Sequence, residues 1–341
     1  METLHYIFRL LAFSQVLFIT SYIVLHERNR AGWLAALSLA GFGCYLLQPM
    51  VHLAGSANSL YLLDFIGSSI PAFLWLFART IFVDDRRVPW RFWILWLVYM
   101  VLWASGYGLG HDWGRSGDVL FELIPQLIKL GLVVHVVIMA MEGRANDLIN
   151  RRLKLRVPVA IGAGSLTSAV ILVEIWAGGD TPMLVELFGS VSMFFITQIA
   201  GLYLFSLRSE LSLGAVAAQQ EQQETVEETD IIPVIEQLMQ EQRFYAVHGV
   251  TLGDLATKVA RPEYRLRTVI NHQMGYRNFN QFLNHYRIAE ANERLLSERS
   301  LPILTIALDV GFKSLSSFNQ SFKAVNGCTP TEFRAKSLTD S

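Results

Sequence analysis

The chain has 341 residues, is 52% hydrophobic and 17% charged, and carries a formal net charge of −1. Because soluble domains have about 25% charged residues, this composition excludes an ordinary soluble protein along the whole length. The apolar runs concentrate in residues 1–207, whereas 208–341 has the composition of a soluble sequence. Two cysteines, Cys44 and Cys328, are too few for a disulfide framework, so we interpret both as free thiols.

Long apolar runs follow one another through the first 207 residues. A membrane-spanning helix needs about 20 mostly apolar residues, and backbone polar groups within lipid must be satisfied inside the segment. Seven runs meet this requirement, at residues 4–25, 31–54, 60–83, 90–108, 119–141, 157–177 and 183–207. The first run lacks a basic flank and a small-residue cleavage site, so we expect it to be retained as a span.

The basic residues of the connecting loops predict the orientation of these helices, because Lys and Arg collect in cytoplasmic loops. Only Arg115 lies in one set of loops. The opposite set holds Arg28, Arg30, Arg86, Arg87, Arg91, Arg144, Arg151, Arg152, Lys154 and Arg156. We therefore expect the N-terminus outside the membrane and the C-terminus in the cytoplasm.

Polar residues within the predicted spans are costly in lipid and are functional candidates. Most of them lie toward the outer side. A candidate ligand pocket contains Asp64, Glu122, Gln126, Lys129, Glu174 and Glu186. Such a pocket would suit a cation, an amine or a polar small molecule. The alternative is interfacial chemistry, with carboxylates at the headgroups and tryptophans in the aromatic belt.

An acidic, Gln-rich segment at 208–230 separates the apolar part from the remainder of the chain. We expect the last apolar helix to continue to about Ala218. Beyond that residue, a flexible tether, a dimer-forming helix and an inert spacer all remain open.

Helical periodicity returns at Ile231 and predicts a domain over 231–336. After a first amphipathic helix, Thr251 is expected to cap a short helix. A second helix is predicted from about Pro262 to Met274. A longer helix is predicted over 278–296. Its core face is expected to contain Phe279, Phe282, Leu283, Tyr286, Ala289 and Leu296.

The pattern of a short helix followed by a second helix then repeats. The short helix begins near Leu304 and ends at Gly311, and Ser314 caps the next helix, which ends at Gly327. Phe318 and Phe322 are expected to anchor that helix in the core. The fold class is therefore all-α: a seven-helix transmembrane bundle followed by a cytoplasmic domain with two helix-turn-helix units.

The second helix of each unit carries side chains that are predicted to face outward and read DNA. In the first unit they are Arg265, Arg267, Asn271 and His272. In the second unit they are Lys313, Ser316, Asn319, Gln320 and Lys323. Arg, Lys, Asn, Gln and Ser pair with base edges in the major groove. Residues 243–336 also hold 13 Lys and Arg against 7 Asp and Glu, an excess that favours phosphate contact. A basic solvated surface is the alternative.

The segment from about 231 to 334 resembles the DNA-binding domain of the AraC/XylS family of bacterial transcription regulators. Its second unit carries the family signature at Ile306-Ala307, Gly311-Phe312, Ser317-Phe318, Phe322-Lys323, Gly327, Thr329-Pro330 and Phe333-Arg334. The first unit fits more loosely, since Pro262 replaces the usual Ser cap and Thr268 a common Arg. The resemblance implies two reading helices in adjacent major-groove segments of double-stranded promoter DNA. It also implies a bacterial origin, so that the membrane is expected to be a bacterial inner membrane, and RNA polymerase as a partner, often with activation.

These features lead to one main hypothesis and two alternatives. The main one is a one-component membrane-bound regulator that senses an unknown small ligand or envelope state, with homodimerisation left open. A transporter or receptor with a regulatory helical tail is the first alternative, although no internal repeat supports a transporter. A membrane-embedded enzyme is the second. No nucleophile elbow, phosphate-binding loop or metal-ligand spacing is found, so we expect no enzymatic activity, no cofactor and no metal.

Overall fold

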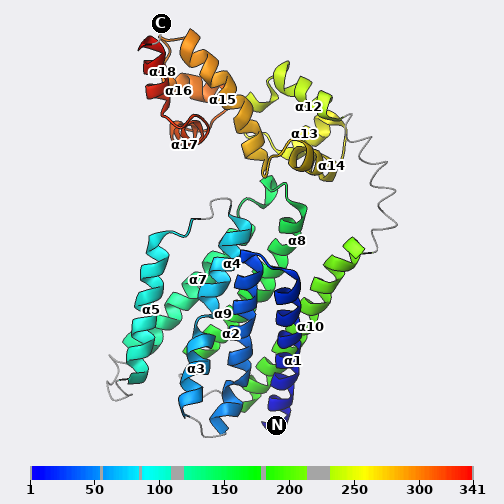
Figure 1. The fold of residues 1–341 in the computed structure, drawn as a ribbon, viewed down its shortest axis with the longest axis vertical. Helices are drawn as coiled ribbons and strands as arrows, with labels where there is room; N and C mark the ends of the chain where they lie inside the picture. Colours follow the sequence, from blue (N-terminus) through cyan, green and yellow to red (C-terminus); the bar gives the residue numbers. More distant parts are fainter. Residues whose placement is uncertain are drawn as a thin grey trace. The chain divides into compact units, whose positions relative to one another are not determined.

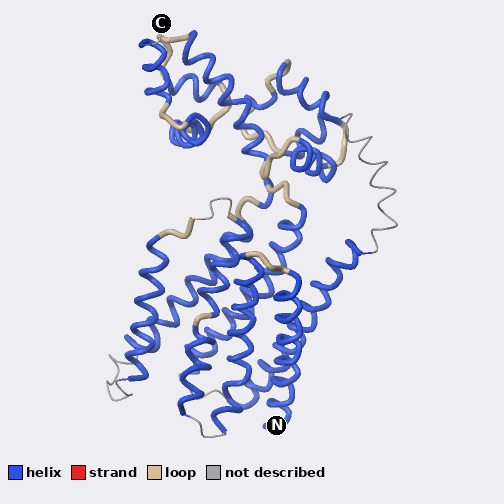
Figure 2. The backbone as a smooth tube through the Cα atoms, in the orientation of Figure 1, coloured by secondary structure: helices blue, strands red, loops and turns tan. Residues whose placement is uncertain are grey.

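The computed structural model describes residues 2–53, 57–83, 87–108, 119–177, 182–212 and 231–339. These residues form helices and loops, with one isolated antiparallel bridge between Asp147 and Asn278, as expected for an all-α chain (Figures 1 and 2). They belong to two compact units. Unit 1 comprises Met1–Glu142 and Lys154–Leu213, and unit 2 comprises Gly143–Leu153 and Gly214–Ser341. Arg86, Arg115 and the linker from 213 to 230 lie outside the described residues.

Unit 1 is a bundle of apolar helices. Its helices are α1 (Glu2–His26), α2 (Arg30–Leu53), α3 (Ala57–Ser68), α4 (Ile70–Phe82), α5 (Trp90–Gly108), α7 (Ile124–Met141), α9 (Ser165–Ala177), α10 (Met183–Ser212) and the part of α8 (Asn150–Pro158) that follows Leu153. Helix α1 packs against α2 and α10, and α2 packs against α3 and α4, which in turn contacts α7. Many large apolar side chains, such as Phe188 and Trp176, face outward. Outward-facing apolar residues are expected where lipid is the solvent.

Six helical segments in the described part of the chain are long and apolar enough to cross a membrane, by length and composition. They cover Glu2–His26, Arg30–Val51, Leu62–Phe82, Val119–Asn146, Arg152–Val173 and Met183–Ser206. The predicted count of seven is therefore not confirmed. The difference is α5, a 19-residue helix that is rich in Trp and Tyr. These amphipathic rings favour the membrane–water interface rather than the hydrocarbon core.

Three of the predicted spans are irregular helices. The run at 60–83 is interrupted at Ser69, next to Pro71 at the start of α4. A π-helical turn precedes α7 (Val119–Leu123), and another follows Pro158 (Val159–Gly164). Proline lacks the N–H of a regular helix, so neighbouring turns must rearrange their hydrogen bonds.

Arg156, one of the basic residues expected in a cytoplasmic loop, is only 2% exposed. Its Nη1 donates to the carbonyls of Met139, Ala140 and Glu142 at 2.9, 3.0 and 2.8 Å, and its Nη2 donates to Phe82 at 3.3 Å. These carbonyls end α7 and α4, where helices lack internal donors and carry partial negative charge. Arg156 therefore joins two helix ends.

Unit 2 contains the predicted pair of helix-turn-helix units. Its helices are α12 (Ile231–Gln240), α13 (Leu252–Val259), α14 (Glu263–Thr268), α15 (Phe279–Ser297), α16 (Ile303–Asp309), α17 (Leu315–Asn326) and α18 (Pro330–Thr339). A π-helical turn over Val269–Gln273 extends α14. The expected caps are present. Thr251 accepts from the Asp254 N–H at 3.2 Å, and Ser314 accepts from the Ser317 N–H at 3.2 Å.

Helix α15 serves two separate cores, and the prediction of its buried face was wrong in its second half. Phe279, Phe282 and Leu283 belong to the core of the first unit, as expected. Ile288, Ala291 and Leu295 belong to the core of the second unit, whereas Ala289 and Leu296 are exposed. The buried face changes because the two cores lie on different sides of one helix, so a single apolar stripe cannot describe it.

Candidate nucleic-acid interface

Helix α17 presents a polar stripe above a tightly packed aromatic core. Phe318 and Phe322 have no exposed surface. The ring centroids of Phe312 and Phe318 lie 5.3 Å apart, and those of Phe318 and Phe322 lie 5.4 Å apart. The predicted DNA-reading residues Ser316, Asn319, Gln320 and Lys323 are all exposed, as is Lys313 before the helix. Spacings of three and four residues place the four helical residues on one face. The arrangement offers amide and hydroxyl groups for base edges, with ammonium groups for phosphates.

The first unit holds its predicted reading residues differently. Leu266, Val269 and Ile270 are buried and anchor α14 and its π turn. His272 is exposed, but the Asn271 amide donates to the Tyr276 carbonyl at 2.8 Å and so closes the turn after the helix.

The two arginines predicted to read DNA in the first unit are half-buried. Arg265 Nε donates to the Tyr264 hydroxyl at 3.3 Å. Arg267 donates to the Glu263 carboxylate at 2.9 Å and to the Asp147 carbonyl. Arg267 is therefore engaged within the protein, whereas the residues of α17 are presented to solvent.

A buried arginine joins the two helix-turn-helix units, and this role was not predicted from the sequence. The side chain of Arg287 on α15 donates from Nε to the Tyr245 carbonyl at 2.8 Å. Its guanidinium also lies 5.5 Å from the ring centroid of Phe312 in the second core. Burial lowers the pKa of Arg287, although an arginine remains protonated at neutral pH. A charged side chain in the middle of a helix carries no sequence signal for such a role.

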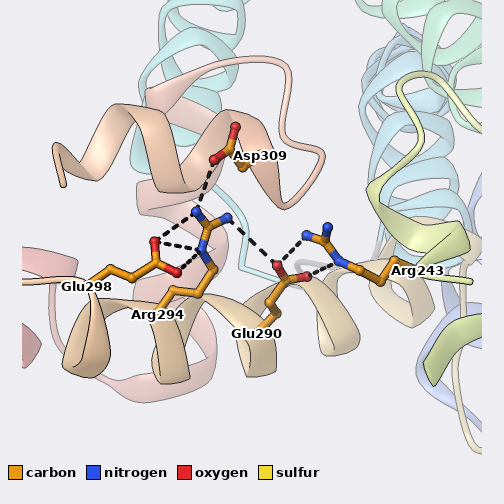
Figure 3. Close-up of a pocket in the computed structure, with 5 residues that line it drawn as sticks. All are labelled: Arg243, Glu290, Arg294, Glu298 and Asp309. Atoms are coloured by element: carbon orange, nitrogen blue, oxygen red, sulfur yellow. Dashed lines mark hydrogen bonds and ion pairs between the residues drawn. The ribbon is translucent and has the colours of Figure 1, made fainter. Parts of the chain in front are cut away.

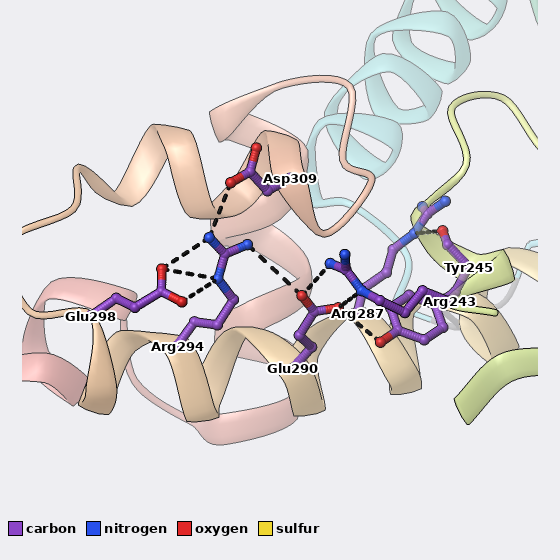
Figure 4. Close-up of polar contacts among 7 residues, drawn as sticks. All are labelled: Arg243, Tyr245, Arg287, Glu290, Arg294, Glu298 and Asp309. Carbon is purple, nitrogen blue, oxygen red and sulfur yellow. Dashed lines mark hydrogen bonds and ion pairs between the residues drawn. The ribbon is translucent and has the colours of Figure 1, made fainter. Parts of the chain in front are cut away.

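A row of ion pairs extends this junction along α15 and lines an open polar pocket (Figure 3). Glu290 accepts from Arg243 and from the Tyr245 hydroxyl, the latter at 2.8 Å. Arg294 pairs with Glu298 at 2.9 Å and with Asp309 on α16 at 3.0 Å. Figure 4 shows the row from the loop before α13 to α16. The spacing of residues 290, 294 and 298 by four was the available sequence signal.

These contacts determine how far apart the two reading helices lie. Gly311, in the turn between α16 and α17, has φ +100° and lies against the Tyr245–Ala246 backbone of the first unit. A Cβ atom at this position would meet three backbone atoms at 2.9 Å. Together with the contacts of Arg287 and the row of ion pairs, this close approach makes the two helix-turn-helix units one body. A fixed separation of reading helices selects a fixed separation of DNA segments.

The polar residues predicted to line a ligand pocket are only partly described. Asp64 accepts from Gln48 and from the Trp103 indole, each at 3.2 Å. Glu186 lies 3.6 Å from His5. Gln126 and Lys129 are half-buried on α7. The side chains of Glu122 and Glu174 lie outside the described residues. In the described ranges, no group of three or more His, Cys, Asp or Glu side chains is placed to hold a metal ion.

Comparison with known proteins identifies one part of the chain. Residues 255–336 match the family model of a helix-turn-helix domain, and this range covers α14 to α17 and most of α13 and α18. No curated protein and no solved structure matches the chain. A domain of this kind is regulatory and is not typically enzymatic. The match over 255–336 supports a DNA-binding domain of the AraC type in this part of the chain, and with it a DNA-binding transcription regulator.

Proposed function

We propose that this protein is a membrane-bound, sequence-specific transcription regulator that couples an envelope or extracellular signal to promoter binding. The observation that carries the proposal is the exposed stripe of α17, which stands on a buried aromatic core within the matched helix-turn-helix domain. The described part of the same chain contains six helical segments that are long and apolar enough to cross a membrane, by length and composition. The combination favours a DNA reader held at a membrane over a soluble one.

The proposed division of labour follows from side-chain chemistry. Asn319 and Gln320 would pair with base edges, to which amides bind in bidentate fashion. Lys313 and Lys323 would contact phosphates and position the helix. A second reading helix, α14, would enter the adjacent major-groove segment on the same DNA face. Promoter DNA and RNA polymerase are the proposed partners, and pairing of two chains would raise affinity through effective concentration.

The direct test uses the full-length protein in lipid nanodiscs. Binding sites are selected from a random library of duplex DNA, and the affinity for the selected sequence is compared among variants. We expect Asn319→Ala with Gln320→Ala to weaken binding by at least about 30-fold, because two base contacts are lost at about 1–3 kcal/mol each. Gln240→Ala, an exposed residue at the end of α12, is the matched control and should bind normally. Failure to select any sequence would reject base-specific reading.

Membrane orientation is the second part of the proposal. A cytoplasmic DNA reader requires an odd number of crossings if the N-terminus is outside, so α5 must cross. If α5 lies at the interface, six crossings require a cytoplasmic N-terminus instead. Protease cleavage of tags at the two ends, in spheroplasts with intact inner membranes, separates these cases. Cleavage at the N-terminus alone supports seven crossings, protection of both ends supports six, and cleavage at the C-terminus rejects a cytoplasmic reader.

The proposed input for the signal is the outer polar group around Asp64. Its carboxylate accepts hydrogen bonds from α2 and α5, so a ligand cation or amine would rearrange contacts between helices. Asp64→Asn removes the charge and keeps one of the two acceptor oxygens, while the other is replaced by an amide donor. In a promoter-reporter screen with small amines, the variant should lose the response while keeping uninduced DNA binding. A full response in the variant would place the input elsewhere.

A further inference from the structure

The short segment Gly143–Leu153, hereafter loop 143–153, follows α7 in the sequence and ends within the first turn of α8. It belongs to the same compact unit as the helix-turn-helix domain. Leu148 is only 1% exposed and lies within the core of the first helix-turn-helix unit, together with Val269 and Phe279. Its N–H donates to the Arg277 carbonyl at 3.2 Å. The loop is therefore inserted between the end of the first reading helix and the start of α15.

The docked loop has the features of a specific binding segment. Asp147 forms an antiparallel bridge with Asn278, the capping residue of α15. The Asp147 carboxylate is buried, and it accepts from Arg152 Nε at 2.6 Å and from the Ile149 N–H at 3.1 Å. A buried charge is tolerated when it is paired in this way. An apolar anchor, a backbone bridge and an internally paired carboxylate together make a defined contact.

The loop also engages a residue predicted to read DNA. Arg267 lies on α14, and its Nη1 donates to the Asp147 carbonyl while its Nη2 donates to Glu263 at 2.9 Å. Only 14% of the Arg267 side chain is exposed. Recognition of guanine requires the donors of the guanidinium fork to face the base. Docking of the loop and reading by Arg267 therefore compete for the same donors.

We infer that the first helix-turn-helix unit carries a docking surface for loop 143–153, and that the docked loop withholds Arg267 from DNA. The inference rests on the proposed DNA-reading function. In sequence the loop connects two predicted membrane helices, so a change at their ends reaches the reader through a short covalent path. By linkage, DNA that engages Arg267 weakens loop docking by the same factor as the loop weakens DNA binding.

Loop docking can be tested without DNA, which separates this inference from the proposed function. Residues opposite each other in an antiparallel bridge have Cα atoms about 4.5–5.5 Å apart, within disulfide range. Asp147→Cys with Asn278→Cys, in a Cys44→Ser, Cys328→Ser background and in nanodiscs, should cross-link on oxidation. Asp147→Cys with Asn319→Cys is the control pair and should not. Hydrogen exchange of the Leu148 N–H, which donates to the Arg277 carbonyl, reports docking in the unsubstituted protein and should be slow. Absence of both the first cross-link and this protection would reject docking, whether or not the protein binds DNA.

Competition is tested with the DNA sequence selected above. Saturating DNA should slow the 147–278 cross-link, and an unchanged rate would overturn the competition. Leu148→Ser, which disfavours insertion of the loop, should tighten DNA binding about tenfold, comparable to the release of one charge-assisted hydrogen bond. The gain should vanish in an Arg267→Ala background. Unchanged or weaker binding by Leu148→Ser, or the same gain without Arg267, would overturn the inference.

Discussion

Substitution of Gly311 by alanine tests whether the two helix-turn-helix units form one rigid body. A Cβ there would lie 2.9 Å from the Cα and O of Ala246 and from the O of Tyr245, all backbone atoms that cannot rotate away. Overpacking costs about 1–3 kcal/mol, and the positive φ adds about 1–2 kcal/mol for an L-residue. We therefore expect Gly311→Ala to destabilise the junction by about 2–5 kcal/mol.

Gly327 provides the matched control for this prediction. It also has a positive φ, +73°, but a Cβ there would meet nothing within 4 Å. Gly327→Ala should therefore cost only the conformational strain of about 1–2 kcal/mol. The difference between the variants isolates the contact between the two units.

Native-state hydrogen exchange of the full-length protein in nanodiscs gives the opening free energies of α16 and α17 in each variant. Footprinting on selected DNA gives the functional consequence. Gly311→Ala should lose simultaneous protection of the two adjacent groove segments, whereas Gly327→Ala should keep it. Equal costs for the two variants, with equal footprints, would refute the rigid junction.

Four further predictions concern local interactions in unit 2, and each is measured by hydrogen exchange or by unfolding followed over pH. Thr251→Ala removes the capping box of α13 and should cost about 1 kcal/mol. The Thr251 hydrogen bonds hold the pKa of Asp254 below its usual range. The ionised cap therefore stabilises the fold at neutral pH, and its contribution to the free energy of unfolding is lost as pH falls below about 4. Asp254→Asn should show no such loss. Burial raises the pKa of Tyr286 to about 12, so stability should fall as pH rises from about 10 to about 12, and Tyr286→Phe should abolish this component. Phe322→Ala should cost about 3–5 kcal/mol because the ring is fully buried, whereas Val325→Ala, at a site 58% exposed, should stay within about 0.5 kcal/mol.

Features with a local cause could be predicted from the sequence. Thr251 and Ser314 cap helices because their side chains accept from an N–H three residues later, a relation contained within four residues. Gly311 and Gly327 were expected at helix ends, and both have positive φ. The outward face of α17 followed from the fixed positions of Phe318 and Phe322.

Features that depend on distant parts of the chain could not be predicted. The buried face of α15 changes where one core ends and the other begins, so periodicity gave Ala289 and Leu296 in place of Ala291 and Leu295. Arg287 is buried because its guanidinium contacts the Tyr245 carbonyl of the first helix-turn-helix unit and the Phe312 ring of the second. Pattern reading assigns such a residue to the surface.

The residues predicted to read DNA are exposed as expected in the second helix-turn-helix unit, whereas in the first unit only His272 is exposed. In the second unit, every predicted reading residue is exposed, because nothing in the described chain covers that face. In the first unit, Asn271 and Arg267 bind backbone carbonyls that are supplied by a turn and by loop 143–153. Leu148 stands in a basic loop without periodicity, so its burial had no sequence signal.

The central claim is that a membrane-bound form of this protein reads specific promoters. The most direct measurement is chromatin-immunoprecipitation mapping of the full-length, membrane-inserted protein beside its Asn319→Ala, Gln320→Ala variant, with membrane fractions monitored in parallel. The proposed function predicts sharp promoter peaks for the first protein, loss of those peaks in the variant, and both proteins in the membrane fraction. Identical maps for the two proteins, or peaks that arise only from a soluble form, would contradict it.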